Sequence, residues 1–194
     1  MCGIAGYRLT RTKRQNGHMV LNGLRAMSHR GPDDEGLTLI DPDRSTRIDL
    51  FTVESQPGLR GLERYEDAAP FEHTVCFGHR RFSIVDLSLG GHQPFWAGDG
   101  RVCVSFNGEI YNYVELREEL EALGHEFRTS SDTEVLAVSY LEWGEGCFER
   151  LNGFWAVSLY DARRRQVLLT RDRLGHAPVS YTPLRAHETN ESIA

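Results

Sequence analysis

Cysteine is scarce in this sequence, and its cysteines form no pair typical of a zinc site or a disulfide framework. The four are spread over 194 residues without a C-x-x-C motif: Cys2, Cys76, Cys103 and Cys147. This spacing favours a reducing compartment. The eight histidines also lack metal-ligand spacing, so we expect no metal site.

Long apolar runs and a surplus of positive charge are missing too. No stretch approaches the ~20 apolar residues needed to cross a bilayer, and the first residues, MCGIAGYRL, lack the apolar core of a signal peptide. Acidic and basic residues are interspersed, with a formal net charge of -6 at pH 7, so no basic stripe is available for phosphate backbones. We therefore expect a cytoplasmic protein that binds neither membranes nor nucleic acids.

The residues that are present give the composition of an ordinary globular protein. Hydrophobic residues make up 40% of the chain and charged residues 26%, which excludes the disordered, collagen-like and membrane classes. A chain of 194 residues is long enough for one domain with a substantial core and too short for two of ordinary size. No internal repeat or low-complexity tract appears, so we expect a single domain.

The first part of the chain predicts strands and one short helix. Small apolar residues at 3–7 favour a buried strand that starts directly after Cys2. Apolar residues at helical spacing predict a helix over 20–27, which ends before a Gly-Pro pair. Strand character returns at 74–77 and at 82–85.

Two segments of this part are predicted to be irregular. Residues 41–72 are polar and charged without clear periodicity, and they are longer than most connections, so we interpret them as an excursion that is partly disordered. Residues 90–94, GGHQP, predict a turn or a mobile loop, and mobility there would gate a pocket.

The second part of the chain alternates strands and helices. It predicts a strand over 102–106, a tight turn, a helix over 113–123 that Gly124 ends, a helix over 131–143 that starts with a capping box, and a hairpin over 154–170. Strands mostly follow strands through short turns, which favours antiparallel sheets with helices on their outer faces. The predicted class is α+β, in layers.

Cys2 directly follows the initiator methionine, and its small side chain permits removal of Met1. The mature residue would then carry a thiol and an α-amine whose unperturbed pKa is about 8, near enough to neutrality to accept the thiol proton. One residue would supply both the nucleophile and its base. The alternative is that Cys2 packs as a small apolar residue, as buried cysteines often do.

Several motifs follow the MCGIAG start in a fixed order. They are HRGPD at 29–33, GHRRFSIVDL at 78–87, FNGEIYN at 106–112, SDTE at 131–134 and RDRLG at 171–175. Through these motifs the chain resembles class II glutamine amidotransferases, which use an N-terminal nucleophile. More narrowly, it resembles the N-terminal glutaminase domain of glutamine-hydrolysing asparagine synthetases.

The resemblance implies a fold and a domain division. The family fold is a four-layer αββα sandwich of two stacked antiparallel sheets, of the Ntn type. The matching part spans residues 2–181, and residues 182–194 form a divergent or truncated tail. The sequence contains no SGG-type pyrophosphatase loop. We therefore expect ATP and magnesium only on a synthetase domain outside this chain, and no cofactor in the chain itself.

The resemblance also assigns the oxyanion-binding groups. The side-chain amide of Asn107 and the backbone N–H of Gly108 would converge on the oxyanion of a tetrahedral intermediate. Glycine allows the backbone to approach closely. The alternative for this pair, taken alone, is a plain turn, because Asn-Gly is a common turn dipeptide.

Glutamine has an α-carboxylate and an α-ammonium group, so a selective site needs a cation and an anion. Carried over from the family pattern, Arg81 would bind the carboxylate, while Asp132 and Glu109 would bind the ammonium group. Ile84 and Val85 would contribute backbone contacts. The alternatives are a solvated surface arginine at position 81 and a helix-capping aspartate at position 132.

The HRGPD motif has a structural role near the site in this interpretation, with Arg30 or Asp33 available for an internal ion pair. The predicted function is hydrolysis of L-glutamine through a Cys2 thioester, which supplies ammonia to an asparagine-synthetase-type amidation. The alternative is a non-catalytic module or truncated fragment that binds a synthetase partner. The two hypotheses differ in whether Cys2 turns over glutamine.

Overall fold

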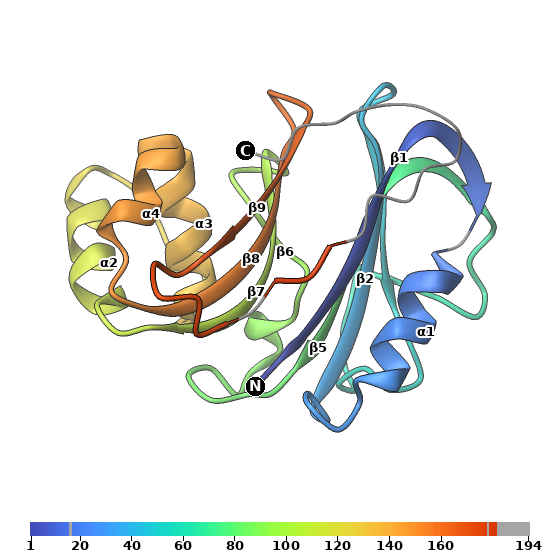
Figure 1. The fold of residues 1–194 in the computed structure, drawn as a ribbon, viewed down its shortest axis with the longest axis horizontal. Coiled ribbons are helices and arrows are strands. Elements are labelled where there is room, and N and C mark those ends of the chain that lie inside the picture. The colour runs from blue at the N-terminus through green and yellow to red at the C-terminus, as the bar shows by residue number, and fades with distance from the viewer. Residues whose placement is uncertain (16, 178, 182–194) are drawn as a thin grey trace.

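Two β-sheets lie face to face at the centre of the molecule (Figure 1). The computed structural model describes residues 1–15, 17–177 and 179–181. One sheet has the strand order β1-β5-β2-β3-β4 and the other the order β6-β7-β8-β9. Neighbouring strands are antiparallel, except that β3 and β4 pair in parallel.

The strands of the five-stranded sheet are β1 (Gly3–Gln15), β2 (Asp34–Asp41), β3 (Thr46–Phe51), β4 (Glu63–Arg64) and β5 (Phe71–Arg81). Those of the four-stranded sheet are β6 (Phe95–Ala97), β7 (Val102–Ile110), β8 (Gly153–Asp161) and β9 (Gln166–Arg171). The α-helices are α1 (His18–Ala26), α2 (Tyr113–Ala122), α3 (Asp132–Trp143) and α4 (Cys147–Arg150). Two short 3-10 helices are η1 (Leu89–Gly91) and η2 (Gly144–Gly146).

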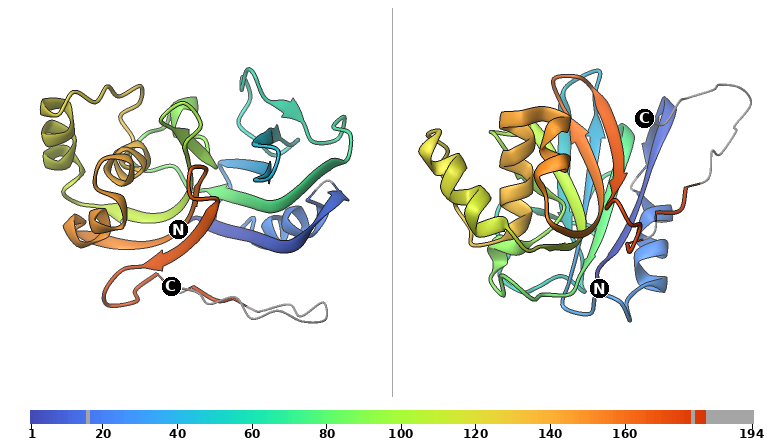
Figure 2. Two further views of the ribbon diagram at one scale, coloured as in Figure 1. Left: turned by 90° about the horizontal axis from the view of Figure 1, so that it is seen from above. Right: turned by 60° about the vertical axis from the view of Figure 1, so that its left-hand side comes forward.

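Helices cover the outer faces of both sheets. In Figures 1 and 2, α1 lies against the five-stranded sheet, and α2, α3 and α4 lie on the far side of the four-stranded sheet. Three apolar clusters separate these layers: one under α1, one under α2 to α4, and one between the sheets. The cluster between the sheets contains Val75 and Phe77 of β5 and Tyr160 of β8. The architecture is therefore the predicted αββα sandwich of class α+β.

Local signals in the sequence located most helices correctly. Leu21 and Leu24 of α1 are buried as their spacing predicts, and Gly124 follows α2 with a φ of 95°. The hydroxyl of Ser131 accepts a hydrogen bond from the backbone of Thr133 and caps α3. The other half of the predicted capping box is wrong, because the Glu134 carboxylate binds the backbone of residues 128–129 instead.

The prediction of an irregular excursion over residues 41–72 is wrong. Those residues contribute β3 and β4 to the sheet, and β2, which was not predicted, precedes them. All eight residues of β2 are buried, including polar ones, so its sequence shows no clean alternation of apolar and polar positions. The predicted buried strand at 3–7 is confirmed as the start of β1, but β1 lies at the sheet edge and Gly6 is exposed.

Two predictions near the strand ends also need correction. Residues 82–85 do not form a strand, because β5 ends at Arg81 and the chain continues as an irregular loop. Asn107 and Gly108 do not form a turn, because β7 runs through both and pairs with β8 up to Ile110. The hairpin of β8 and β9 is confirmed.

The predicted tail over residues 182–194 lies outside the described residues. Within the described part of the chain, no helix combines the length and the apolar character that crossing a membrane requires.

Candidate active site

The start of β1, the end of β5 and the start of β2 lie side by side at one end of the five-stranded sheet. Because β1 pairs with β5, Gly3 lies opposite Arg80, and because β2 pairs with β5, Asp34 lies opposite Arg81. This register places Cys2, the residue before β1, beside the end of β5. The backbone N–H of Phe82 donates a hydrogen bond of 3.3 Å to the Cys2 sulfur.

The four-stranded sheet supplies the opposite side of the site through β7. Asn107 pairs with Ala156 of β8, and Gly108 pairs with Trp155. A Cβ atom at position 108 would lie 2.1 Å from the carbonyl oxygen of Phe154. Only glycine therefore fits at position 108 with β7 and β8 this close together.

A hydrogen bond between the sheets aligns the two sides. His79 Nδ1 of β5 lies 2.9 Å from the hydroxyl oxygen of Ser105 in β7. Side chains two residues apart in a strand lie on the same face of the sheet. Arg81 therefore lies on the same face of β5 as His79, and Asn107 lies on the same face of β7 as Ser105. The bond thus directs Arg81 and Asn107 toward the same space between the sheets.

One cavity collects every residue that the sequence predicted for glutamine hydrolysis. Its lining includes Cys2, Arg81, Ile84, Val85, Asn107, Gly108, Glu109 and Asp132. These residues come from the start of β1, the end of β5 and its loop, the end of β7 and the first turn of α3. They are dispersed along the sequence and assembled by the fold.

Arg81 is held in place by the loop that follows it. One terminal nitrogen of its guanidinium donates to the Ser88 carbonyl at 3.0 Å, and the other donates to the Asp86 carbonyl. The side chain is buried in the protein and borders the cavity, so it is not the solvated surface arginine of the alternative interpretation. These two bonds use two of the five N–H groups of the guanidinium.

Asp132 lies in the first turn of α3 and is buried. Its carboxylate accepts a hydrogen bond of 3.2 Å from the Ile110 backbone. Burial raises the pKa of Asp132 to about 6, and the neighbouring charge of Glu109 adds to the increase, whereas backbone hydrogen bonds oppose it. Two acidic side chains thus line the cavity, Glu109 from β7 and Asp132 from the first turn of α3.

Burial also raises the pKa of the Cys2 thiol, although the Phe82 backbone and the positive N-terminus oppose this increase. The thiol is therefore a poor nucleophile at neutral pH unless a base accepts its proton. Met1 borders the same cavity next to Cys2.

The Asn107 side chain is nearly buried, and its Oδ1 atom has no hydrogen-bond partner among the described residues. The side chain also borders the cavity. A side-chain amide carries N–H donors, the kind of group that stabilises an oxyanion.

Sequence reasoning missed Gln93, which also borders the cavity. Its Oε1 accepts a hydrogen bond of 2.7 Å from the Phe106 backbone, and its Nε2 lies 3.3 Å from the Thr133 hydroxyl. The predicted turn at 90–94 is confirmed, since η1 covers Leu89–Gly91, but its last residues are anchored to β7 and α3. The only sequence signal for Gln93 was its place in the turn, which carries no information about these contacts.

The HRGPD motif supports the end of β5, as predicted, but not through the suggested ion pair. The Gly31 carbonyl accepts a hydrogen bond of 2.8 Å from Arg80, and the Asp33 carboxylate accepts one of 2.8 Å from the Ser83 backbone. Arg80 is buried and pairs with Glu35 at 3.1 Å. Among the described residues, no group of three or more His, Cys, Asp or Glu side chains is arranged to hold a metal.

Comparisons with known proteins agree with the fold and the motifs. A family model described as a glutamine amidotransferase domain matches residues 58–192. Two Bacillus subtilis proteins, asparagine synthetases [glutamine-hydrolyzing] 3 and 2, are 47% and 35% identical over 57% and 97% of this chain. A putative asparagine synthetase [glutamine-hydrolyzing] 2 of Methanocaldococcus jannaschii is 31% identical over 93% of it. The chain spans 18%, 21% and 32% of the lengths of these three relatives, respectively.

A solved structure shows the same fold in a more distant protein. The glutamine phosphoribosylpyrophosphate amidotransferase of B. subtilis superimposes with a TM-score of 0.59 at 23% identity, over 87% of this chain and 36% of that one. This chain belongs to the glutamine amidotransferase domain family. Its sequence relatives within that family include glutamine-hydrolysing asparagine synthetases.

Proposed function

We propose that this chain hydrolyses L-glutamine to glutamate and ammonia, with Cys2 as the nucleophile. The observation that carries the proposal is the single cavity lined by the thiol, an asparagine-glycine pair, a buried arginine and two carboxylates. These are the groups that cleavage of a side-chain amide and recognition of a free amino acid require.

The ends of the substrate are recognised by opposite charges. The free N–H groups of Arg81 bind the α-carboxylate of glutamine, and Asp132 with Glu109 binds the α-ammonium group. Ile84 and Val85, in the loop after β5, add backbone contacts. A carboxylate and an ammonium group at fixed separation orient the side-chain amide toward Cys2.

The reaction begins when the Cys2 sulfur forms a bond to the amide carbon. The carbonyl π electrons move to the oxygen, and the Asn107 amide with the Gly108 backbone N–H stabilises the resulting oxyanion. When the C–N bond breaks, the leaving nitrogen takes a proton and departs as ammonia, which leaves a thioester on Cys2. Water then attacks the thioester carbon, and glutamate and the free thiol are released.

The proton acceptor for the thiol is the α-amine of Cys2 itself, exposed by removal of Met1. A base is needed because burial raises the thiol pKa. An α-amine has an unperturbed pKa of about 8 and reaches its own side chain directly or through a water molecule. Since Met1 borders the cavity, its removal also opens space beside the nucleophile.

The ammonia serves an ATP-dependent amidation of the asparagine synthetase type. This part of the proposal is supported by the names of the relatives, which are asparagine synthetases and of whose lengths the match covers only 18%, 21% and 32%. On this proposal ATP and magnesium act on a synthetase domain, carried by a longer chain or by a separate subunit, and not in the Cys2 cavity.

Three versions of the chain test the proposal: the mature chain, Cys2→Ala, and a chain with one extra residue before Cys2. Intact mass defines each N-terminus, and glutamate release measures hydrolysis. We expect activity only in the mature chain, and we expect Cys147→Ala, which changes a thiol remote from the cavity lining, to retain it. Equal glutamate release from all versions would contradict the mechanism, and none from the mature chain would favour a non-catalytic module.

A further inference from the structure

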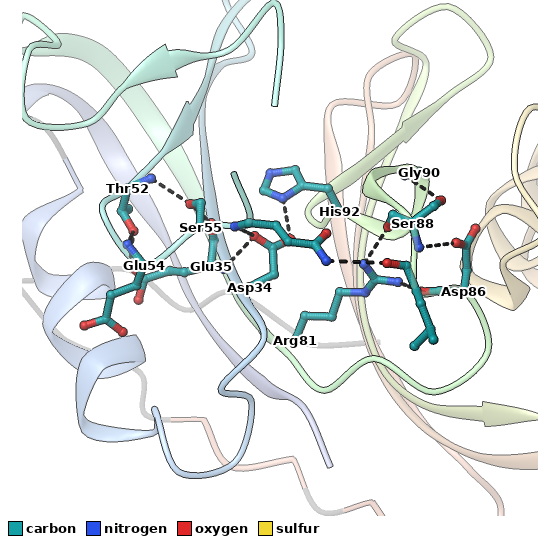
Figure 3. Close-up of polar contacts among 12 residues, drawn as sticks. Asp34, Glu35, Thr52, Glu54, Ser55, Arg81, Asp86, Ser88, Gly90 and His92 are labelled. Atoms are coloured by element: carbon teal, nitrogen blue, oxygen red, sulfur yellow. Dashed lines mark hydrogen bonds and ion pairs between the residues drawn. The ribbon is translucent and has the colours of Figure 1, made fainter. Parts of the chain in front are cut away.

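The loop over residues 86–93 surrounds the Arg81 guanidinium (Figure 3). Carbonyl groups of Asp86 and Ser88 accept its hydrogen bonds, and Gly91 faces it from the end of η1. A Cβ atom at position 91 would lie 1.8 Å from an Arg81 terminal nitrogen. The orientation of Arg81 therefore depends on where this loop lies.

His92 attaches the loop to the five-stranded sheet. Its Nδ1 atom lies 2.6 Å from the Asp34 Oδ2 atom at the start of β2, and both side chains are largely shielded from solvent. Figure 3 shows the imidazole directed at this carboxylate, between Arg81 on one side and residues 52–55 on the other. Because a carboxylate only accepts, the contact requires a hydrogen on Nδ1.

Asp34 is itself fixed. Its other oxygen accepts hydrogen bonds from the backbone N–H groups of Glu35 at 2.9 Å and Gln56 at 2.8 Å. Burial alone would raise the pKa of Asp34, but the hydrogen bond and charge of His92 and the two backbone groups outweigh it and lower that pKa. The carboxylate is thus a charged, rigid anchor for His92.

The next residue, Gln93, anchors the same end of the loop to the other side of the cavity. Gln93, next to His92, binds the Phe106 backbone directly before Asn107, and it contacts Thr133 directly after Asp132. The His92 attachment is thus the link between the Arg81 side of the cavity and the side that carries the oxyanion and ammonium groups.

We propose that His92, oriented by Asp34, is a positioning residue for Arg81 and thereby sets the affinity for the α-carboxylate of glutamine. The part of this proposal that concerns glutamine affinity rests on the proposed glutaminase function, whereas the part that concerns the position of Arg81 does not. Loss of the His92 bond releases the loop and loosens the guanidinium. The chemical step at Cys2 uses other groups, so KM rises while kcat changes little.

The first test measures Arg81 directly and needs no activity. In a 15N NMR spectrum of the mature chain, the Arg81 Nε–H signal is assigned by its disappearance in Arg81→Lys. We expect this signal to shift and broaden in His92→Phe, which keeps a ring of similar size, and to persist in His92→Asn, whose amide N–H can replace Nδ1–H. His125→Phe breaks a comparable pair with Glu142, 2.9 Å apart and outside the cavity lining, and serves as the matched control.

The second test measures kinetics on the same variants. Loss of a hydrogen bond to a charged group should raise the glutamine KM of His92→Phe about tenfold, with kcat within about twofold of the unmodified chain. His92→Asn should recover most of the affinity. With 4-aminobutanamide, which lacks the α-carboxylate, His92→Phe and the unmodified chain should have equal kcat/KM.

The outcomes separate this proposal from the proposed function. An unchanged Arg81 signal in His92→Phe overturns the positioning role, whether or not the chain hydrolyses glutamine. An altered signal without any glutamate release from the unmodified chain supports the positioning of Arg81 and contradicts the glutaminase function. If His92→Phe fails to fold, as thermal unfolding would show, Asp34→Ala removes the acceptor of the same bond, and an unchanged Arg81 signal there again overturns the proposal.

Discussion

The two sides of the cavity are supported by different physical means. Behind Cys2 and Arg81, the five-stranded sheet places a network of buried polar groups that includes Asp34, Glu35 and Arg80. Behind Asn107, Gly108 and Asp132, the four-stranded sheet packs on α3 through a large apolar cluster. Polar support is directional but costly when one partner is lost, whereas apolar support tolerates changes that conserve volume.

The largest loss of activity is expected at Gly108, where the packing of β7 against β8 leaves no room for a side chain. Gly108→Ala places a Cβ atom against the Phe154 carbonyl, so it displaces the backbone N–H that is proposed to stabilise the oxyanion. We expect kcat/KM for glutamine to fall about a thousandfold, since one such donor contributes 10²–10³ in rate. Gly146→Ala has open space around the new atom and should leave kcat/KM within about twofold of the unmodified chain. Comparable losses in both variants would contradict the proposed role of Gly108.

Removing a charge from the polar side tests the contrast directly. Arg80→Met leaves the fully buried Glu35 carboxylate without its cation, so we expect the free energy of unfolding to fall by about 3–5 kcal/mol in urea titrations. Leu136→Met, in the apolar cluster, conserves volume and should cost less than about 1.5 kcal/mol. Equal costs for the two variants would show that the two sides do not differ in this way.

A smaller effect is expected from the titration of Asp132. Its pKa of about 6 means that the carboxylate gains a proton as the pH falls below that value, and the neutral form binds an ammonium group poorly. Protonation of the α-amine already lowers kcat/KM for glutamine as the pH falls below about 8, so we expect Asp132 to add a further decrease of about tenfold per pH unit well below pH 6. Asp132→Asn should have a KM raised by about tenfold or more at pH 8, and only this further decrease below pH 6 should be absent. A pH profile that is identical in both proteins would contradict the assignment.

The smallest effect concerns the hydrogen bond that joins the sheets. Burial lowers the pKa of His79 to about 3; the nearby Asp34 opposes this, and the charges of His92 and Arg81 add to it. Below pH 6.5 the unfolded chain therefore binds a proton that the folded chain does not, and stability falls with decreasing pH until about pH 3. The slope approaches about 1.4 kcal/mol per pH unit for one proton.

The measurement is the free energy of unfolding between pH 7 and pH 4.5, a range chosen to lie above most carboxylate titrations. His79→Asn keeps an N–H donor for Ser105 but does not titrate, so we expect a shallower dependence on pH. If His79→Asn and the unmodified chain gave the same slope, His79 would not be the group responsible.

Local sequence signals predicted the elements whose causes are local. The helices α1, α2 and α3 and the β8–β9 hairpin follow from apolar spacing, glycine stops and turn residues. The prediction for residues 41–72 is wrong because β3 pairs with β2, whose eight residues are all buried and therefore show no alternation of apolar and polar positions. Thr38 of β2, for example, donates to Asp49 of β3, so a polar residue is buried without any local sign of it.

The candidate site shows the same division. The residue types for glutamine hydrolysis were present in the motifs, and all eight residues predicted from them border one cavity. The turn predicted at residues 107–108 is wrong, because pairing of β7 with β8 overrides the turn preference of the Asn-Gly pair. Gln93 and His92 were not recognised, because their importance lies in contacts with Phe106 and Asp34, which are distant in sequence.

The sequence by itself therefore determined the family, the layered α+β class and the chemical groups of the site, because these depend on residue identity and on patterns within a few turns of chain. Only the tertiary structure decided how those groups face one another. The register of β1, β5 and β2 brings Cys2, Arg81 and Asp34 to one edge, and the stacking of the sheets brings Asn107 opposite them. Register and stacking arise from contacts between segments far apart in the chain, and no local pattern encodes them.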